Sequence, residues 1–126
     1  MNATAPSRSI ALSGEAGVAR RQVAETLDEA NWRGDVDSVL LAVHEALVNA
    51  QRHAGGVSRA TACLDGDSFR VEVWDRGKGF RMPRSTAAPD TMAERGRGLF
   101  LMRRLASDVR IARTAGEVGL LLRFEP

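Results

Sequence analysis

The sequence predicts an α+β fold, a two-layer sandwich whose helices pack on one face of a mixed, mainly antiparallel sheet. Three observations lead to this class. The chain has 126 residues, 44% of them apolar, which suits one domain with a single two-layer core. Two segments with helical spacing of apolar residues follow a short strand-like run. A third helix-like segment then lies between two pairs of alternating, β-rich runs.

The first predicted elements are a tail, a strand and a helix. Residues 1–7 are small and polar, and we expect them to form a disordered tail before a single domain at 8–126. The run "RSIALS" alternates from residue 8 and predicts a strand. Apolar residues then recur at helical spacing from Glu15, which predicts a helix that ends near Gly34.

The second helix has the clearest pattern in the chain. Apolar residues recur at alternating intervals of four and three between Asp35, a typical helix start, and Gly55. Glu45, Asn49 and His53 are each four residues apart, so they share one face of this helix. The stripe is either an ordinary solvated face or a chemical site. A carboxylate can accept a proton from an attacking hydroxyl, and a carboxamide oxygen is a suitable ligand for Mg²⁺.

The second half predicts two strand pairs separated by a loop and a helix. Asp65-Gly66 lies between alternating runs and predicts a hairpin. The next residues contain two prolines and little periodicity, and such a length without structure suggests a functional lid, at about 81–95. The run "GRGLFLMRRLASD" predicts a helix that begins at glycines, and 109–124 predicts a final strand pair around Ala115-Gly116.

Two glycine-rich stretches flank the predicted lid. In "VWDRGKGF", Asp75 ends a strand and could accept from an exocyclic amine, while Gly77 and Gly79 would leave room for a planar ring. In "ERGRGLF", Gly96 and Gly98 open a helix whose N–H groups could bind phosphate. Taken singly, each stretch could also be an ordinary turn or helix start. Neither matches a P-loop or the dinucleotide-binding GxGxxG pattern.

Composition limits the classes of function. The formal net charge of +2 provides no strong overall field that would attract nucleic acid. Acids predominate from Glu15 to Glu45, whereas arginines predominate from Glu94 to Arg113, so the second half could face an anion. Cys63 is the only cysteine, and no segment approaches the roughly 20 apolar residues of a membrane span. We therefore expect a cytoplasmic protein that contacts neither nucleic acid nor membrane directly.

Three motifs together resemble a known family. "HEALVNAQRHA", "VWDRGKGF" and "GRGLFLMRRL" resemble the N-box and the two glycine boxes of ATP-binding domains of the gyrase and histidine-kinase type, the Bergerat fold. Within this group, the chain resembles the stand-alone anti-sigma factor serine/threonine kinases of bacteria over essentially its whole length. The resemblance implies ATP and Mg²⁺ as cofactors.

The resemblance also implies roles for residues of this sequence. It implies that Glu45 is the general base, that Asn49 coordinates Mg²⁺ and that Asp75 binds the adenine amino group. The other implied nucleotide-binding residues are Gly77, Gly79 and Phe80 beside the adenine, and Gly96, Arg97, Gly98 and Leu99 over the phosphates. The role of His53 is left open, because a packing or capping histidine is as compatible with its position as a catalytic one.

One position departs from the family pattern. Many relatives have a threonine beside the glycine of the penultimate turn, where its hydroxyl can reach phosphate. Here Glu117 follows Gly116. The corresponding phosphate contact is therefore either missing or supplied by Thr114.

The resemblance implies protein partners as well. It implies an anti-sigma factor that binds a sigma factor, phosphorylates a small anti-sigma factor antagonist on serine or threonine, and forms a homodimer in a stress response. One alternative is a non-catalytic ATP-binding regulatory module that sequesters a protein partner. Another is a non-enzymatic scaffold whose glycines are only turns. A complete sensor histidine kinase is not expected, because the sequence shows no phosphoacceptor-histidine helix and no transmembrane segment.

Overall fold

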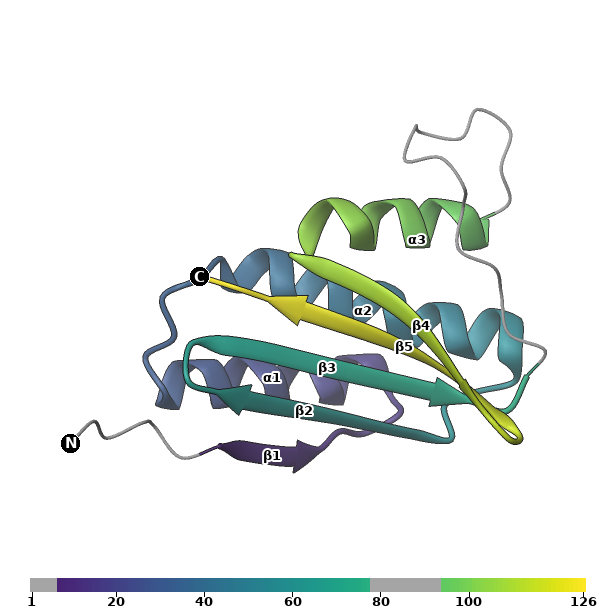
Figure 1. Cartoon of the computed structure of the whole chain (residues 1–126), viewed down its shortest axis with the longest axis horizontal. Helices are drawn as coiled ribbons and strands as arrows, with labels where there is room; N and C mark the ends of the chain where they lie inside the picture. The colour runs from purple at the N-terminus through teal and green to yellow at the C-terminus, as the bar shows by residue number, and fades with distance from the viewer. Residues whose placement is uncertain (1–6, 78–93) are drawn as a thin grey trace.

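Five strands form one open sheet, and three helices cover one of its faces (Figure 1). The computed structural model describes residues 7–77 and 94–126. The predicted fold class is confirmed, and every pair of neighbouring strands in the described part is antiparallel. Residues 1–6 of the predicted tail and 81–93 of the predicted lid lie outside the described residues.

The elements follow one another in the predicted order. They are β1 (Arg8–Ala11), α1 (Ala16–Glu29), α2 (Val36–Ala54), β2 (Arg59–Asp65), β3 (Ser68–Asp75), α3 (Glu94–Leu105), β4 (Asp108–Thr114) and β5 (Glu117–Phe124). The strands lie side by side in the order β1-β2-β3-β5-β4, so β3 is the central strand and β5 lies next to it.

The first helix is shorter than the sequence pattern predicts. The pattern predicts an end near Gly34, but α1 ends at Glu29. Asn31 takes a φ of 52°, in the left-handed region, so the chain leaves the helix before Trp32. The Trp32 ring instead packs beside Phe69 of β3, with 6.3 Å between ring centroids. Tertiary packing of this ring therefore replaces the last helical turn that its spacing suggests.

The second helix begins and ends where the sequence predicts. The Asp35 side chain caps α2 and accepts hydrogen bonds from the Ser38 N–H and hydroxyl, at 3.2 and 2.7 Å. Both bonds lower the pKa of Asp35, and the bond from the Ser38 hydroxyl has the larger effect. Gly55 closes the helix with a φ of 77°, a conformation that glycine adopts without strain. None of the described helices is both long and apolar enough to cross a membrane.

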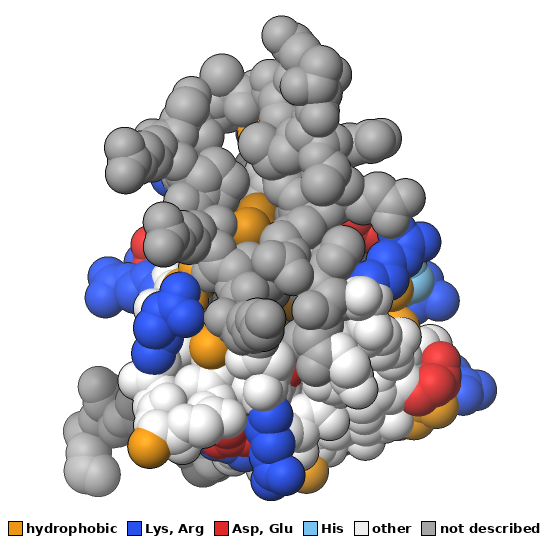
Figure 2. All heavy atoms as spheres, turned by 90° about the vertical axis from the view of Figure 1, so that its right-hand side faces the viewer, with side chains coloured by type: hydrophobic (Ala, Val, Ile, Leu, Met, Phe, Trp, Pro, Cys, Tyr) orange, Lys and Arg blue, Asp and Glu red, His pale blue; other side chains and the backbone are white. Residues whose placement is uncertain are grey.

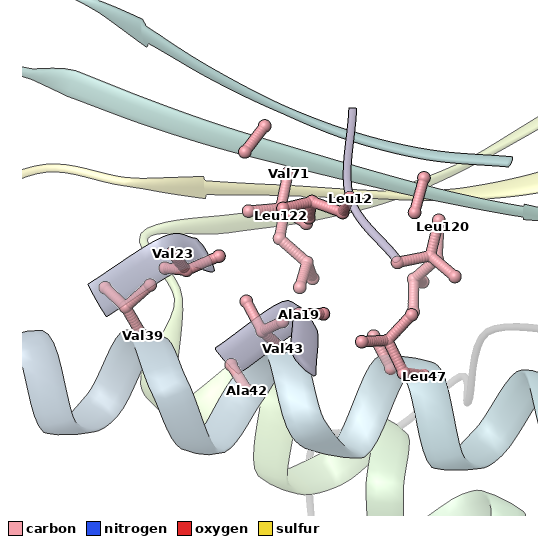
Figure 3. Close-up of a cluster of buried hydrophobic side chains, with 14 of the residues drawn as sticks. Leu12, Ala19, Val23, Val39, Ala42, Val43, Leu47, Val71, Leu120 and Leu122 are labelled. Atoms are coloured by element: carbon pink, nitrogen blue, oxygen red, sulfur yellow. The ribbon is translucent and has the colours of Figure 1, made fainter. Parts of the chain in front are cut away.

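The core lies between the helices and one face of the sheet. Apolar side chains of α2, among them Val43 and Leu47, meet inward-facing residues of β3 and β5 such as Val71, Leu120 and Leu122 (Figure 3). All five are at most 3% exposed. This packing fixes α2 over the centre of the sheet.

The alternation of side chains along β3 decides which residues face the helices. Val71 and Val73 belong to the core, whereas Arg70 is exposed on the face that no helix covers. Since successive side chains of a strand point to opposite faces, Asp75 lies on the helix side with Val73, and Trp74 lies on the uncovered side. The last residue of β3 therefore points into the layer between sheet and helices.

Candidate functional site

The three predicted motifs meet at one end of the molecule. The last turns of α2, the end of β3 and the start of α3 all lie at the right-hand end in Figure 1. Figure 2 faces this end and shows several arginine side chains spread around its rim. The fold thus brings the three motifs, which are far apart in the sequence, to the same end of the molecule.

Gly98 of α3 lies against the two polar side chains of the α2 stripe. An ideal Cβ built on Gly98 would lie 3.7 Å from Nδ2 of Asn49 and 3.7 Å from Oε1 of Glu45. These are ordinary van der Waals distances, so alanine would fit there. Its methyl group would nevertheless occupy space that both polar side chains face. The glycine therefore lets α3 come close to both polar side chains of α2, and we call the place where Gly98, Glu45 and Asn49 meet the polar recess.

Asn49 is buried and has an unsatisfied amide nitrogen. The residue is only 5% exposed, and Nδ2 makes no hydrogen bond to any residue in the described part of the chain. Leaving a buried polar group unpaired costs about 1–3 kcal/mol. The amide oxygen and nitrogen can also exchange places by a flip, so the unpaired position suits either a donor or an acceptor. A ligand group that pairs with Asn49 would remove this cost.

Asp75 is the most buried carboxylate of the described residues, with 3% exposure. One of its oxygens accepts a hydrogen bond from the Gly77 N–H at 2.9 Å. An ionised carboxylate offers about four acceptor positions, so it can serve the backbone and a ligand N–H together. Asp75 therefore anchors the first glycine stretch while remaining chemically suited to recognise an amine.

For the remaining predicted site residues, the structure describes only some of the positions or side chains. The helix α3 begins at Glu94, before the glycines at which the sequence predicts its start. Gly96 therefore lies in the first turn, where N–H groups have no acceptor within the helix, and Arg97 follows it. The Leu99 side chain is 1% exposed and belongs to the core cluster. The side chain of Arg97 and that of His53 lie outside what the structure describes, as do Gly79 and Phe80 altogether.

Glu117, the residue that departs from the family pattern, has a structural role that the sequence does not indicate. It accepts hydrogen bonds from the Ser58 hydroxyl at 2.5 Å and from Arg59 Nε at 3.1 Å. The Ser58 bond is the main cause of a lowered pKa of Glu117. The turn between β4 and β5 is thereby tied to the start of β2. Thr114 is exposed at the same turn, opposite Glu117.

We expect the link between Glu117 and Ser58 to make stability depend on pH. Since the folded-state pKa of Glu117 is lowered from 4.5, its contribution is present above pH 4.5 and is lost as pH falls through the folded-state pKa. Glu117→Gln should therefore melt at a lower temperature than the wild type at pH 7, with the difference shrinking toward pH 3. Thermal denaturation followed by circular dichroism across this range measures the effect.

A double-mutant cycle provides the control for this link. If the hydrogen bond from Ser58 is responsible, Ser58→Ala should lower the melting temperature at pH 7 as much as Glu117→Gln does. The double variant should then melt at about the same temperature as either single variant. Fully additive effects of the two substitutions would contradict the proposed coupling.

Comparison with known proteins shows the family of this chain and a related fold among the solved structures. Residues 11–125 match the sequence model of the family described as "Histidine kinase-like ATPase domain". Among curated proteins, no significant match is found. The structure is similar to that of the RsbU and RsbW domains of Rv1364c from Mycobacterium tuberculosis, with a TM-score of 0.64 and 26% sequence identity. This similarity covers 95% of the present chain but 32% of the other.

Proposed function

Because the chain belongs to the histidine kinase-like ATPase domain family, we propose that it binds ATP between α2, the end of β3 and the start of α3, and acts as an anti-sigma factor kinase. The family match and the similarity to a structure containing an RsbW domain support an ATP-binding regulatory function. The observation that supports the position of the site best is the buried, unpaired Asn49 amide facing Gly98. A buried amide without a partner is a hydrogen-bonding group that a ligand at this place would satisfy.

Asp75 would recognise the base. Its buried carboxylate can accept a hydrogen bond from the exocyclic amine of adenine, and burial strengthens such a bond. A guanine has a carbonyl at that position, which would place two acceptors against each other. The carboxylate therefore favours adenine over guanine.

Asn49 is the described residue best suited to contact Mg²⁺. The ion prefers oxygen ligands, keeps several waters, and is commonly held by one or two protein groups together with substrate phosphates. Among the described residues, no group of three or more His, Cys, Asp or Glu could hold a metal ion. When bound, Mg²⁺ would offset negative charge on the phosphates.

Glu45 would act as the general base for phosphoryl transfer. It lies one helical turn before Asn49, and its carboxylate faces the same recess beside Gly98. There it would take the proton from a seryl or threonyl hydroxyl of a small antagonist protein, while positioning and electrostatics supply the remaining catalysis. We further propose a sigma factor as the second partner and a homodimer as the working form.

Two measurements test this function. Isothermal titration calorimetry with ATP and Mg²⁺ should show binding, with GTP bound more weakly. The protein is then purified from its native host with its partners, and transfer of a radiolabelled γ-phosphate to a small protein is measured, followed by mapping of the phosphorylated residue. ATP binding without transfer would instead support a regulatory module that sequesters its partner, and absence of ATP binding would overturn the proposal.

Gly98→Ala should separate binding from folding. The added methyl group would lie in van der Waals contact with Glu45 and Asn49, where the nucleotide is proposed to bind, so we expect about a tenfold loss of ATP affinity, or about 1.4 kcal/mol. Stability should be retained or rise, because alanine favours a helix over glycine by about 1 kcal/mol. Calorimetric titration and thermal melting measure the two effects.

Gly17→Ala is the control for this substitution. Gly17 lies in α1 and is not among the proposed site residues, so ATP affinity should stay at the wild-type value. Equal affinities of Gly98→Ala and the wild type would show that the recess does not receive the nucleotide.

A further inference from the structure

Trp74 is buried even though its strand position directs it to the uncovered face of the sheet. It is 6% exposed, but it does not belong to the core cluster that contains Val71 and Val73. The strand register places it between Arg59 of β2 and Gly119 of β5. Neighbouring strands, rather than helices, must therefore cover this ring.

The indole ring lies flat against the backbone of Gly119. A Cβ on Gly119 would come within 2.6 Å of ring atoms Cδ2, Cε2 and Cε3, so any other residue there would force the ring to move. The Arg59 guanidinium lies over the ring at 4.3 Å from its centroid, a cation–π contact. The ring N–H donates to Glu72 at 2.9 Å. The contacts with Gly119 and Arg59 together restrict the movement of the Trp74 ring.

The backbone next to Trp74 is held as firmly as the ring. The carbonyl oxygen of Trp74 accepts a hydrogen bond from the Ser58 N–H at 2.8 Å, while the single hydroxyl hydrogen of Ser58 is donated to Glu117. Ser58 and Arg59 both bind Glu117, which joins the start of β2 to the start of β5. We call Trp74 with Ser58, Arg59, Glu117 and Gly119 the Trp74 clamp.

We infer that the Trp74 clamp positions Asp75 and thereby sets the affinity and base preference of the nucleotide site. This inference rests on the proposed function. Trp74 and Asp75 are consecutive and point to opposite faces of the sheet, so fixing the ring on one face fixes the direction of the carboxylate on the other. Asp75 is the last residue of β3, where a strand would otherwise fray. Trp74 is thus a positioning residue, because it lies on the face away from the recess.

The two tryptophans of the chain provide a matched test. Trp74→Leu should lower ATP affinity about tenfold and reduce the preference for ATP over GTP, as expected when a supporting residue of a site is lost. Trp32 lies where α1 joins α2, at the other end of the molecule in Figure 1. Trp32→Leu should therefore lower the melting temperature but leave the ATP affinity and the preference for ATP over GTP unchanged. Trp74→Phe keeps an aromatic ring at this position, so it should restore part of the ATP affinity and part of the preference for ATP over GTP. Affinities are measured by calorimetry well below the melting temperature of each variant.

Gly119→Ala tests the same inference without removing a functional group. In a Trp32→Phe background Trp74 is the only fluorophore, so acrylamide quenching reports its exposure. We expect Gly119→Ala to increase quenching and weaken ATP binding together. Should the Trp74 and Gly119 variants fail to fold, Arg59→Gln is the milder change, and we expect it to have a smaller effect in the same direction. Arg70→Gln is its control, since Arg70 also lies on the uncovered face but pairs with Asp65.

The outcomes separate this inference from the proposed function. A wild type that binds no ATP would overturn both. A wild type that binds ATP, with folded Trp74→Leu, Gly119→Ala or Arg59→Gln variants of unchanged affinity and base preference, would overturn the Trp74 clamp alone. Equal losses in the Trp74 and Trp32 variants would also overturn it, because they would reflect general destabilisation.

Discussion

We expect Asp75→Asn to lower the affinity for ATP about 100-fold, which corresponds to about 2.7 kcal/mol. The substitution replaces a carboxyl acceptor in a residue that is 3% exposed, where little water competes for the hydrogen bond. The new carboxamide can also direct its own NH₂ group at the adenine amine, which opposes binding. Calorimetric titration with ATP and Mg²⁺ measures the loss.

Asp75→Asn should not unfold the protein. The asparagine oxygen can still accept the hydrogen bond from the Gly77 N–H, so the start of the glycine stretch keeps its anchor. We expect a melting temperature within about 4 °C of the wild type, equivalent to about 1 kcal/mol for a domain of this size. Asp65→Asn is the matched control, because Asp65 is exposed at the far end of β2 and pairs with Arg70. Unchanged ATP affinity in Asp75→Asn would remove Asp75 from the site.

The fold could be predicted from the sequence because most of its signals are local. The alternating runs on both sides of Asp65-Gly66 and Ala115-Gly116 each specify a hairpin by their own turn chemistry. The end of α1 could not be predicted in the same way. Trp32 has helical spacing, but it leaves the helix to pack beside Phe69, which belongs to a distant strand. A contact of that kind leaves no periodic signal in the sequence.

In the candidate site, too, some features can be predicted from local sequence signals and others depend on tertiary contacts. Residue types and spacing make Glu45, Asn49 and Asp75 candidates, and the family resemblance carried by the three motifs together gives these residues their expected roles. The sequence cannot show that Gly98 faces Asn49, because that contact depends on how α3 packs on α2. Nor does the sequence single out Trp74 as a supporting residue. Its spacing is that of any strand residue, and only the register of three strands brings Arg59 and Gly119 to its ring.

We expect Glu45→Ala to bind ATP with nearly wild-type affinity but to lose phosphoryl transfer. Asn49 and Asp75, which are proposed to hold the nucleotide, remain in place, so the free energy of binding should change by no more than about 1 kcal/mol. Without a general base, the transfer rate should fall by about 100-fold to 10,000-fold. The rate is measured as radiolabel transferred from ATP to the small protein that co-purifies from the native host.

Glu45→Gln refines this experiment because it keeps the size and shape of the side chain beside Gly98. If the carboxylate acts as a base, glutamine should impair transfer as severely as alanine, since an amide cannot take the proton. If Glu45 only fills space in the recess, glutamine should restore most of the rate. Glu25→Gln, the same change on the exposed side of α1, should leave both binding and transfer unaltered. Wild-type transfer by Glu45→Ala would show that another group removes the proton, and a large loss of ATP affinity would show that Glu45 holds the nucleotide instead.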